Sequence, residues 1–330
     1  MHKTIIVDSS CNMLYASFYL KGLRAYDDYK IKFRSLPFHG LDHDNQYLAL
    51  IIKNVEERKV IIDFGNLDVI FQKALDWCDV YGKVNVNVED LEKPKMVSIG
   101  PLTAINVFSP FGTLWHAFMN LIMSINRIPN IKLFLGFYRA QLKRPKINQY
   151  LNEFSTSNYI FFASSLWKKE KEVNDIRANF IKVCRNFEHI VFEGGFAPRT
   201  NNDIHGYEAL TMTERLKSDV FLNQTKKSFM VFNTPSVGGC NGWKLAEYLS
   251  MGKAIISTPL VRVMPEKFTD LQHYLITDGS IQDLEQKIQK LSEDDELRER
   301  LERNAKNYYD QVLSPEVVIK KLISHKLSHE

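Results

Sequence analysis

Cysteine and glycine are both scarce in this sequence of 330 residues. The four cysteines, Cys11, Cys78, Cys184 and Cys240, lie far apart, and no two of them form a Cys-x-x-Cys pair. That spacing excludes a disulfide scaffold and a zinc knuckle, and it is typical of a reducing compartment. Only 15 residues are glycine, while 45% are hydrophobic and 25% charged, which excludes collagen-like, low-complexity and disordered chains.

Acidic residues are missing from 60 consecutive positions, from Lys93 to Asn152. A stretch whose charged residues are all positive predicts a surface that binds anions, unless acidic residues elsewhere in the fold neutralise it. The window contains no recognisable DNA- or RNA-binding module, so we expect no nucleic-acid partner. Its basic residues are Lys93, Lys95, Arg127, Lys132, Arg139, Lys143, Arg144 and Lys146.

No charge at all lies between Lys95 and Arg127, yet we do not expect a membrane span. Pro110 would break a spanning helix near its middle, and several polar residues surround it. The segment instead predicts a buried strand at 96–99 and a helix at about 113–125. One helix face is apolar, and we expect it to pack in the core, with a lipid surface as the alternative. That face consists of Leu114, Trp115, Phe118, Leu121, Ile122 and Ile125.

Short β-branched runs alternate with helical patterns along the whole chain. This alternation predicts an α/β protein with parallel sheets in two Rossmann-like domains. We place the boundary in the charged segment 145–157, which gives domains at 1–150 and 151–310 and a C-terminal helix at 311–330. Strands are expected at 3–7, 59–63, 80–86, 96–99, 132–136, 159–163, 190–193, 228–233 and 254–257. The first run is shorter than the apolar part of a signal peptide, so we expect a cytoplasmic protein.

The usual phosphate-binding motifs are also missing. The loop after the first strand reads Asp8-Ser9-Ser10-Cys11-Asn12, without the glycines that a dinucleotide fold needs there. There is no Gly-x-x-x-x-Gly-Lys-Ser/Thr motif, no His-Glu-x-x-His and no Gly-x-Ser-x-Gly. A nucleotide would have to be held in another way.

Residues 228–259 supply that alternative, because they predict a strand, a glycine-rich loop and a helix that begins near Trp243. The helix start can bind an anion through unpaired amides and the helix dipole. Lys244, in the first turn, is unfavourable there unless an anion is bound nearby. Glu247, one turn further, can accept hydrogen bonds from the two hydroxyls of a ribose.

This segment, GWKLAEYLSMGKAIIST, resembles the donor-binding region of GT-B glycosyltransferases of group 1. The tail DDELRERLERNAKNYYDQVLSPEVVIKKL resembles the closing helices of the same group. The resemblance covers most of 157–325 and implies a GT-B fold, in which two Rossmann-like domains face each other across a cleft. It also implies a donor-binding second domain, an acceptor-binding first domain and a last helix that crosses back.

The resemblance further implies the donor-binding residues. Glu247 matches the glutamate that holds the ribose, whereas Gly239 stands where the group often has a second glutamate. The arginine that the group places after the first strand of the second domain is absent. The implied donor-site residues are Glu247, Gly238, Gly239, Asn241, Gly242, Lys244, Gly194, Gly195, Ser165, Lys168 and Lys171.

For the reaction, the resemblance implies a hexosyl transfer from a nucleotide-sugar without metal or other cofactor. The acceptor is expected to be a lipid-linked saccharide in capsule or other surface-polysaccharide synthesis, with the protein peripheral on the inner membrane face. Asp8 and His43 are the candidate bases. Arg139, Lys143 and Arg144 are candidates for contacting the acceptor or an anionic membrane.

Two alternatives stay open. One is an enzyme of the sugar-nucleotide epimerase kind, which also binds a nucleotide-sugar between two domains. The other is a non-catalytic partner subunit with the same fold, which Gly239 and the missing arginine favour.

Overall fold

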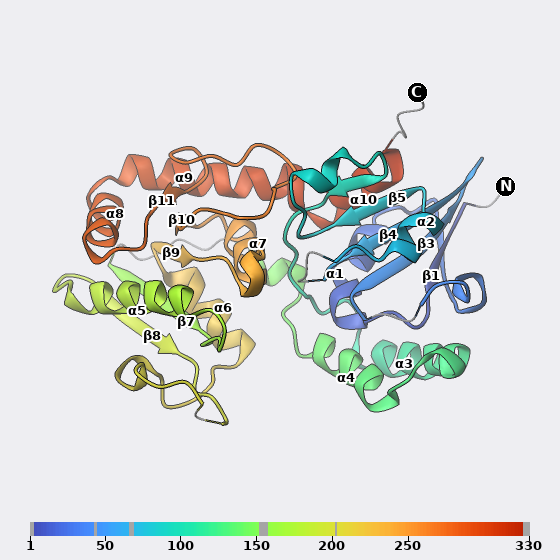
Figure 1. Ribbon diagram of the computed structural model, residues 1–330, viewed down its shortest axis with the longest axis horizontal. Coiled ribbons are helices and arrows are strands. Elements are labelled where there is room, and N and C mark those ends of the chain that lie inside the picture. Colours follow the sequence, from blue (N-terminus) through green and yellow to red (C-terminus); the bar gives the residue numbers. More distant parts are fainter. Residues whose placement is uncertain (1–2, 43–44, 66–68, 152–157, 202, 326–330) are drawn as a thin grey trace. The chain divides into compact units, whose positions relative to one another are not determined.

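The computed structural model describes residues 3–42, 45–65, 69–151, 158–201 and 203–325 (Figure 1). These residues group into two compact units. Unit 1 takes the described residues of Met1–Ile147, Arg262–Glu266 and Gln311–Glu330, and unit 2 takes those of Asn148–Val261 and Lys267–Asp310. Within the described ranges, every helix is too short or too polar to cross a bilayer.

Unit 1 is built on a six-stranded sheet in the order β2-β1-β3-β4-β5-β6. The neighbouring strands pair in parallel except β3, which runs antiparallel to both β1 and β4. The strands are β1 (Thr4–Asp8), β2 (Lys30–Arg34), β3 (Tyr47–Lys53), β4 (Glu57–Asp63), β5 (Val80–Lys83) and β6 (Met96–Ser98). The helices are α1 (Met13–Leu23), α2 (Gln72–Trp77), α3 (Pro110–Ser124), α4 (Ile131–Leu142) and α10 (Pro315–Ser324).

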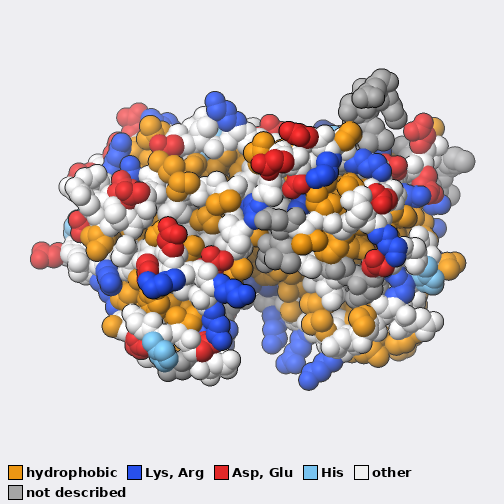
Figure 2. All heavy atoms as spheres, viewed as in Figure 1, with side chains coloured by type: hydrophobic (Ala, Val, Ile, Leu, Met, Phe, Trp, Pro, Cys, Tyr) orange, Lys and Arg blue, Asp and Glu red, His pale blue; other side chains and the backbone are white. Residues whose placement is uncertain are grey.

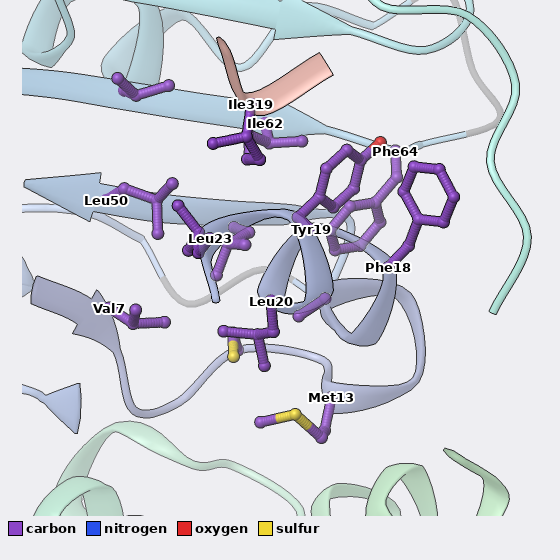
Figure 3. Packing of buried hydrophobic residues seen from close by; sticks show 14 of the residues in the cluster. Val7, Met13, Phe18, Tyr19, Leu20, Leu23, Leu50, Ile62, Phe64 and Ile319 are labelled. Atoms are coloured by element: carbon purple, nitrogen blue, oxygen red, sulfur yellow. The ribbon is translucent and has the colours of Figure 1, made fainter. Parts of the chain in front are cut away.

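Figure 3 shows the core of unit 1, where side chains of α1 face strands of the sheet. Leu20 and Leu23 of α1 are buried together with Val7 and Leu50 of β1 and β3. Ile319 of α10 belongs to the same core. The end of the chain therefore contributes to the hydrophobic core of the unit that contains its beginning.

Gly22 lets α10 approach α1 closely, and this gives a first prediction. A Cβ added at Gly22 would lie 2.1 Å from the carbonyl oxygen of Pro315. We expect Gly22→Ala to lower the free energy of unfolding by about 1–3 kcal/mol, the usual cost of overpacking, seen as a lower melting temperature. Gly136→Ala in α4 is the control, because no atom lies within 4 Å of the added carbon and alanine favours the helix by about 1 kcal/mol. Equal melting temperatures for the two variants would contradict this packing.

Unit 2 is also α/β, with two parallel ladders in the orders β7-β8 and β11-β10-β9. The amide of Phe229 donates to the carbonyl of Tyr159 at 3.0 Å, so the start of β9 lies beside β7. The strands are β7 (Tyr159–Ser164), β8 (Val191–Phe196), β9 (Met230–Asn233), β10 (Ala254–Ser257) and β11 (Leu275–Ile276). The helices are α5 (Lys171–Asn186), α6 (Ser218–Lys227), α7 (Trp243–Ser250), α8 (Ile281–Glu293) and α9 (Asp295–Tyr308).

The α/β class is thus confirmed, with parallel strand pairs in both units. The antiparallel β3 is a departure from the expected parallel sheet. The placement of two domains across a cleft stays a prediction.

Two expectations for unit 1 are wrong. Residues 132–136 are not a strand but part of α4, whose start is capped by the Asn130 side chain accepting from the Leu133 amide at 2.9 Å. Of the apolar face expected to pack in the core at 113–125, only Leu121 packs against the core; the other five residues are exposed, and the buried side of α3 is formed by small and polar residues. Those buried residues are Thr113, Ala117, Asn120 and Ser124.

Candidate functional site

A pocket opens in unit 2 at the carboxyl ends of β7 and β9. From β7 the chain crosses to β8 on one side and later to β9 on the other, so these strands border a topological switch point, where open α/β sheets bind ligands. The pocket holds about 550 Å³ of space, part of it open to solvent. Its lining consists of Phe162, Ser164, Ser165, Trp167, Arg177, Phe232, Asn233, Thr234, Ser236, Gly242, Trp243 and Lys244.

Arg177 is the buried cation of this pocket, with 5% of its surface exposed. Its guanidinium donates to Thr234 Oγ1 at 2.8 Å, to the Ser165 carbonyl at 3.0 Å and to the Pro235 carbonyl at 3.3 Å. All three acceptors are neutral, and no carboxylate of the described residues forms an ion pair with it. Burial lowers the pKa of Arg177 to about 10, so the side chain stays charged near neutral pH.

Lys244 is the second cation and comes from the first turn of α7. Its ammonium donates to the carbonyl of Ala163 and lies 4.9 Å from the centre of the Phe162 ring. Burial, followed by the charge of Arg177, lowers the pKa of Lys244 to about 7. Two cations without a paired carboxylate in one pocket create a site that an anion would stabilise.

The start of α7 faces the same pocket, since Gly242, Trp243 and Lys244 all line it. Gly242 is the N-cap residue and has no side chain that could cap the first amides. The positive end of the helix dipole therefore adds to the two cations. This arrangement can bind a group with two or more negative oxygens, such as a diphosphate.

Glu247 lies one turn further along α7 and does not line the pocket. Its carboxylate is buried and accepts a hydrogen bond from the hydroxyl of Tyr150 at 3.4 Å. The charge of Glu247 also acts on Lys244, whose pKa it raises against the larger effect of burial. Glu247 is thus near the pocket, on the next turn of the helix that carries Lys244.

The loop amides expected to contact the donor are already used within the protein. Gly238 donates its amide to Glu170 Oε1 at 2.9 Å, and Gly239 donates to the Ser236 carbonyl at 3.1 Å. Gly239 has a φ of +72°, and an added Cβ would lie 3.1 Å from the Val261 side chain. A glutamate at this position would be strained, which explains why glycine stands there. Asn241 is buried and does not line the pocket.

Gly194 and Gly195 lie outside the pocket as well. A Cβ at Gly194 would lie 2.0 Å from the Phe162 carbonyl oxygen, and one at Gly195 would lie 2.4 Å from the Leu210 carbonyl oxygen. Both have positive φ, +116° and +148°. These glycines therefore permit close packing of β8 against its neighbours, and a role in approaching a ligand is not needed to explain them.

The two lysines predicted from the loop after β7 have acidic partners outside the pocket. Lys168 pairs with Asp203 at 2.6 Å, and Lys171 pairs with Asp175 at 2.6 Å. Of the predicted donor residues, the pocket brings together Ser165, Gly242 and Lys244.

Arg177 was not expected from the sequence, although a signal for it exists. The buried positions of α5 follow a helical spacing, and Arg177 stands among them beside Ala178. An arginine on the apolar side of a helix is rarely buried without a partner, so it marks a polar site. It places a positive charge in the pocket, where the loop after β7 has no arginine.

In unit 1, Asp8 ends β1 and is buried. Its carboxylate accepts from Arg127 Nη1 at 2.9 and 3.1 Å, from the Ser10 amide at 2.9 Å and from Ser10 Oγ at 2.8 Å. These contacts account for Asp8 without a catalytic role, and its assignment as a base stays a prediction. The other candidate, His43, lies outside the described residues.

The three predicted basic residues lie at the end of α4 or just beyond it. Arg139 and Lys143 are exposed, whereas Arg144 is half-buried and donates to the Ala104 carbonyl at 3.2 Å. No group of three or more His, Cys, Asp or Glu side chains within the described ranges is placed to hold a metal ion.

Comparison with known families finds one match. Residues 212–308 match the family model described as "Glycosyl transferases group 1". The matched residues include α6, α7 and α9, and therefore Lys244 and Glu247, but not Arg177. No relative was found among curated proteins.

Several solved structures resemble the chain at low identity. TarM has a TM-score of 0.45 and 12% identity, covering 93% of this chain and 57% of that protein. A glycosyltransferase from Rickettsia africae ESF-5 has a TM-score of 0.42 and 13% identity, covering 75% and 64%. UDP-GlcNAc 2-epimerase from Neisseria meningitidis bound to UDP-GlcNAc has a TM-score of 0.41 and 11% identity, covering 94% and 96%. The chain therefore spans less than two thirds of the length of the first two.

Proposed function

We propose that this chain, whose residues 212–308 match the glycosyl transferases group 1 family, transfers a sugar from a nucleotide-sugar to a saccharide acceptor. The observation that carries the proposal is the pocket of unit 2, in which Arg177, Lys244 and the start of α7 lie together. A nucleoside diphosphate has the charge and the oxygen atoms that these groups bind. Glu247, on the next turn, is the candidate for holding the ribose.

The same groups would serve the chemistry as well as the binding. Breaking the bond between the sugar and the diphosphate places further negative charge on the leaving oxygen. Arg177, Lys244 and the α7 dipole are fixed before the reaction and would stabilise this charge without reorganisation. In this proposal the hexosyl transfer needs no metal ion, because the protein itself supplies the positive charge.

The acceptor belongs to the same proposal. We assign it to unit 1 and describe it as a lipid-linked saccharide, used in capsule or other surface-polysaccharide synthesis on the inner face of the membrane. Arg139, Lys143 and Arg144 support this part, because they lie in the window without acidic residues and suit an acceptor diphosphate or an anionic membrane.

Glu247→Ala tests the ribose assignment. We expect it to weaken binding of UDP or GDP by about 1.5–3 kcal/mol, the cost of losing hydrogen bonds to a charged group. Isothermal titration would measure this, with Glu285→Ala on the exposed side of α8 as the control. Normal nucleotide binding by the Glu247 variant, together with an unchanged melting temperature, would show that the carboxylate does not contact the ligand.

An assay on UDP-, GDP- and dTDP-sugars separates this function from its alternatives. A glycosyltransferase transfers the sugar to an acceptor, or slowly to water, and the nucleoside diphosphate is released as the leaving group. An epimerase inverts one carbon centre of the sugar, and its product is still a nucleotide-sugar. A non-catalytic subunit binds the nucleotide, seen as a thermal shift, and does neither. Release of diphosphate that is lost in Arg177→Met would support the proposal, and either of the other two outcomes would contradict it.

A further inference from the structure

Helix α3 turns its apolar face away from the core of unit 1. Phe111 is 79% exposed and Leu114 is 71% exposed, whereas the buried side of the helix is polar or small. A surface helix of a globular protein has the opposite arrangement. The exposed apolar residues of α3 and the turn after it, which we call the α3 face, are Phe111, Leu114, Trp115, Phe118, Ile122 and Ile125.

Specific contacts hold α3 in this orientation. Ser124 Oγ lies 2.6 Å from Ser9 Oγ, and Arg127, which follows the helix, forms the ion pair with Asp8. Asn120 donates to the hydroxyl of Tyr138 in α4 at 2.8 Å, which joins the two helices. The polar side is thus bonded to the end of β1 and to α4, so the apolar side has to face outward.

Helix α4 continues the pattern. Ile131, Leu133 and Leu135 at its start are exposed, and the cations Lys132 and Arg139 are exposed on the same helix. In Figure 2, hydrophobic side chains gather over the region that Figure 1 labels α3 and α4, with Lys and Arg side chains beside them. No acidic residue occurs between Lys93 and Asn152, so α3 and α4 carry no negative charge, and the Lys and Arg side chains of the two helices lie on α4.

We propose that the α3 face inserts into the boundary between the headgroups and acyl chains of an anionic lipid bilayer. Exposed Leu, Ile and Phe side chains beside Lys and Arg, without acids, are the composition of helices that lie in this interface. Trp115 is the residue type found at the level of the headgroups. The helix has 15 residues and therefore lies along the surface instead of crossing. The inference rests on the proposed function in that a lipid-linked acceptor brings the enzyme to a bilayer.

Sedimentation of the full chain with vesicles tests the insertion. We expect binding to phosphatidylcholine vesicles that contain phosphatidylglycerol, and a loss of about tenfold or more in the partition coefficient for the double variant Phe118→Asp with Ile122→Asp. Val55→Asp is the matched control, because Val55 is an exposed apolar residue of unit 1 outside α3 and α4. Equal binding by the double variant and this control would overturn the proposal.

Quenching of the Trp115 fluorescence tests how deeply the α3 face inserts into the bilayer. Lipids brominated on their acyl chains should quench part of the fluorescence of the wild type, and that part should be missing in Trp115→Phe. Unquenched fluorescence in vesicle-bound protein would overturn insertion. A dimer in sedimentation velocity that the double variant abolishes, without vesicle binding by the wild type, would mean that the α3 face joins two copies. These experiments use no nucleotide, so their failure would leave the donor pocket and its titration with UDP unaffected.

Discussion

Asp8→Asn is expected to destabilise unit 1 by about 3–5 kcal/mol, the usual cost of removing one partner from a buried ion pair. Arg127 would keep its charge at a site where only about 10% of its side chain is exposed, and the neutral amide would replace the carboxylate that accepts from Nη1 at 2.9 Å. Differential scanning calorimetry would show the change as a lower melting temperature for this unit.

Two variants serve as controls, one at an exposed ion pair and one in which both partners of the buried pair are replaced. Asp28→Asn removes the carboxylate of the exposed pair with Lys3 and should change stability by less than about 1 kcal/mol. The double variant Asp8→Asn with Arg127→Met leaves no buried charge and should recover part of the loss. If Asp8→Asn melts like the wild type but loses sugar transfer, the carboxylate is catalytic and the structural role described above is wrong.

This prediction also bears on α3. Arg127 ends the short turn that follows α3, and Ser9, next to Asp8, contacts Ser124 at the helix end. Losing the ion pair should therefore loosen the attachment of α3 to the sheet before the sheet itself unfolds. Hydrogen exchange would show faster exchange in 110–127 than in β1 and β4 for the variant.

The strand–loop–helix unit that borders the pocket of unit 2 could be predicted from the sequence because its signals are local. The helix expected to begin near Trp243 is α7, and Gly252 follows its end with a φ of +62°. Gly252 donates to the Leu249 carbonyl and Lys253 to the Tyr248 carbonyl, both at 3.0 Å, which is the usual glycine-terminated helix end. Each of these features depends only on residues close together in the chain.

The orientation of α3 could not be predicted in the same way. The helical spacing of Leu114, Phe118 and Ile122 shows that these residues share a face, but not what lies against it. In the structure, Ser124 and Arg127 meet Ser9 and Asp8, more than a hundred residues away in the sequence, and these contacts decide which side is buried. For α4, the alternation of Ile131, Leu133 and Leu135 favours a strand, whereas the buried Phe134 and Tyr138 have helical spacing.

At the candidate site, Arg177 is the charged residue that was not predicted from the sequence. Its distance in sequence from Lys244 hides the fact that β7 and β9 are neighbours, which brings α5 and α7 to one pocket. The family resemblance pointed to a cation in the loop after β7, whereas in the structure the arginine of the pocket comes from α5, the helix that follows. In the proposed function Arg177 takes the place of the missing loop arginine, which removes one argument for a non-catalytic subunit.

The affinity for UDP or GDP is expected to fall as the pH rises above about 7, because binding would require Lys244 to take up a proton. In the free protein, burial and Arg177 lower the pKa of Lys244 to about 7, so above this pH the amine is mostly neutral. A bound diphosphate favours the ammonium and raises this pKa again. Between the pKa of Lys244 in the free protein and its higher pKa in the complex, Kd should rise up to about tenfold for each pH unit. Below the pKa of the free protein, Lys244 should have no effect on the pH dependence.

Titration calorimetry at about pH 8 in two buffers of different ionisation enthalpy would count the protons taken up on binding, and we expect close to one. Lys244→Met should abolish the uptake, flatten the pH dependence above about pH 7 and weaken binding at pH 7 by about 1.5–3 kcal/mol. Lys182→Met, on the exposed side of α5, should behave like the wild type. Because Arg177 stays charged over this range and Glu247 is retained, the wild type and the Lys244 variant differ in one titrating group near the pocket. Equal proton uptake by the two proteins would mean that the diphosphate does not reach Lys244, and the pocket at the ends of β7 and β9 would then not be the donor site.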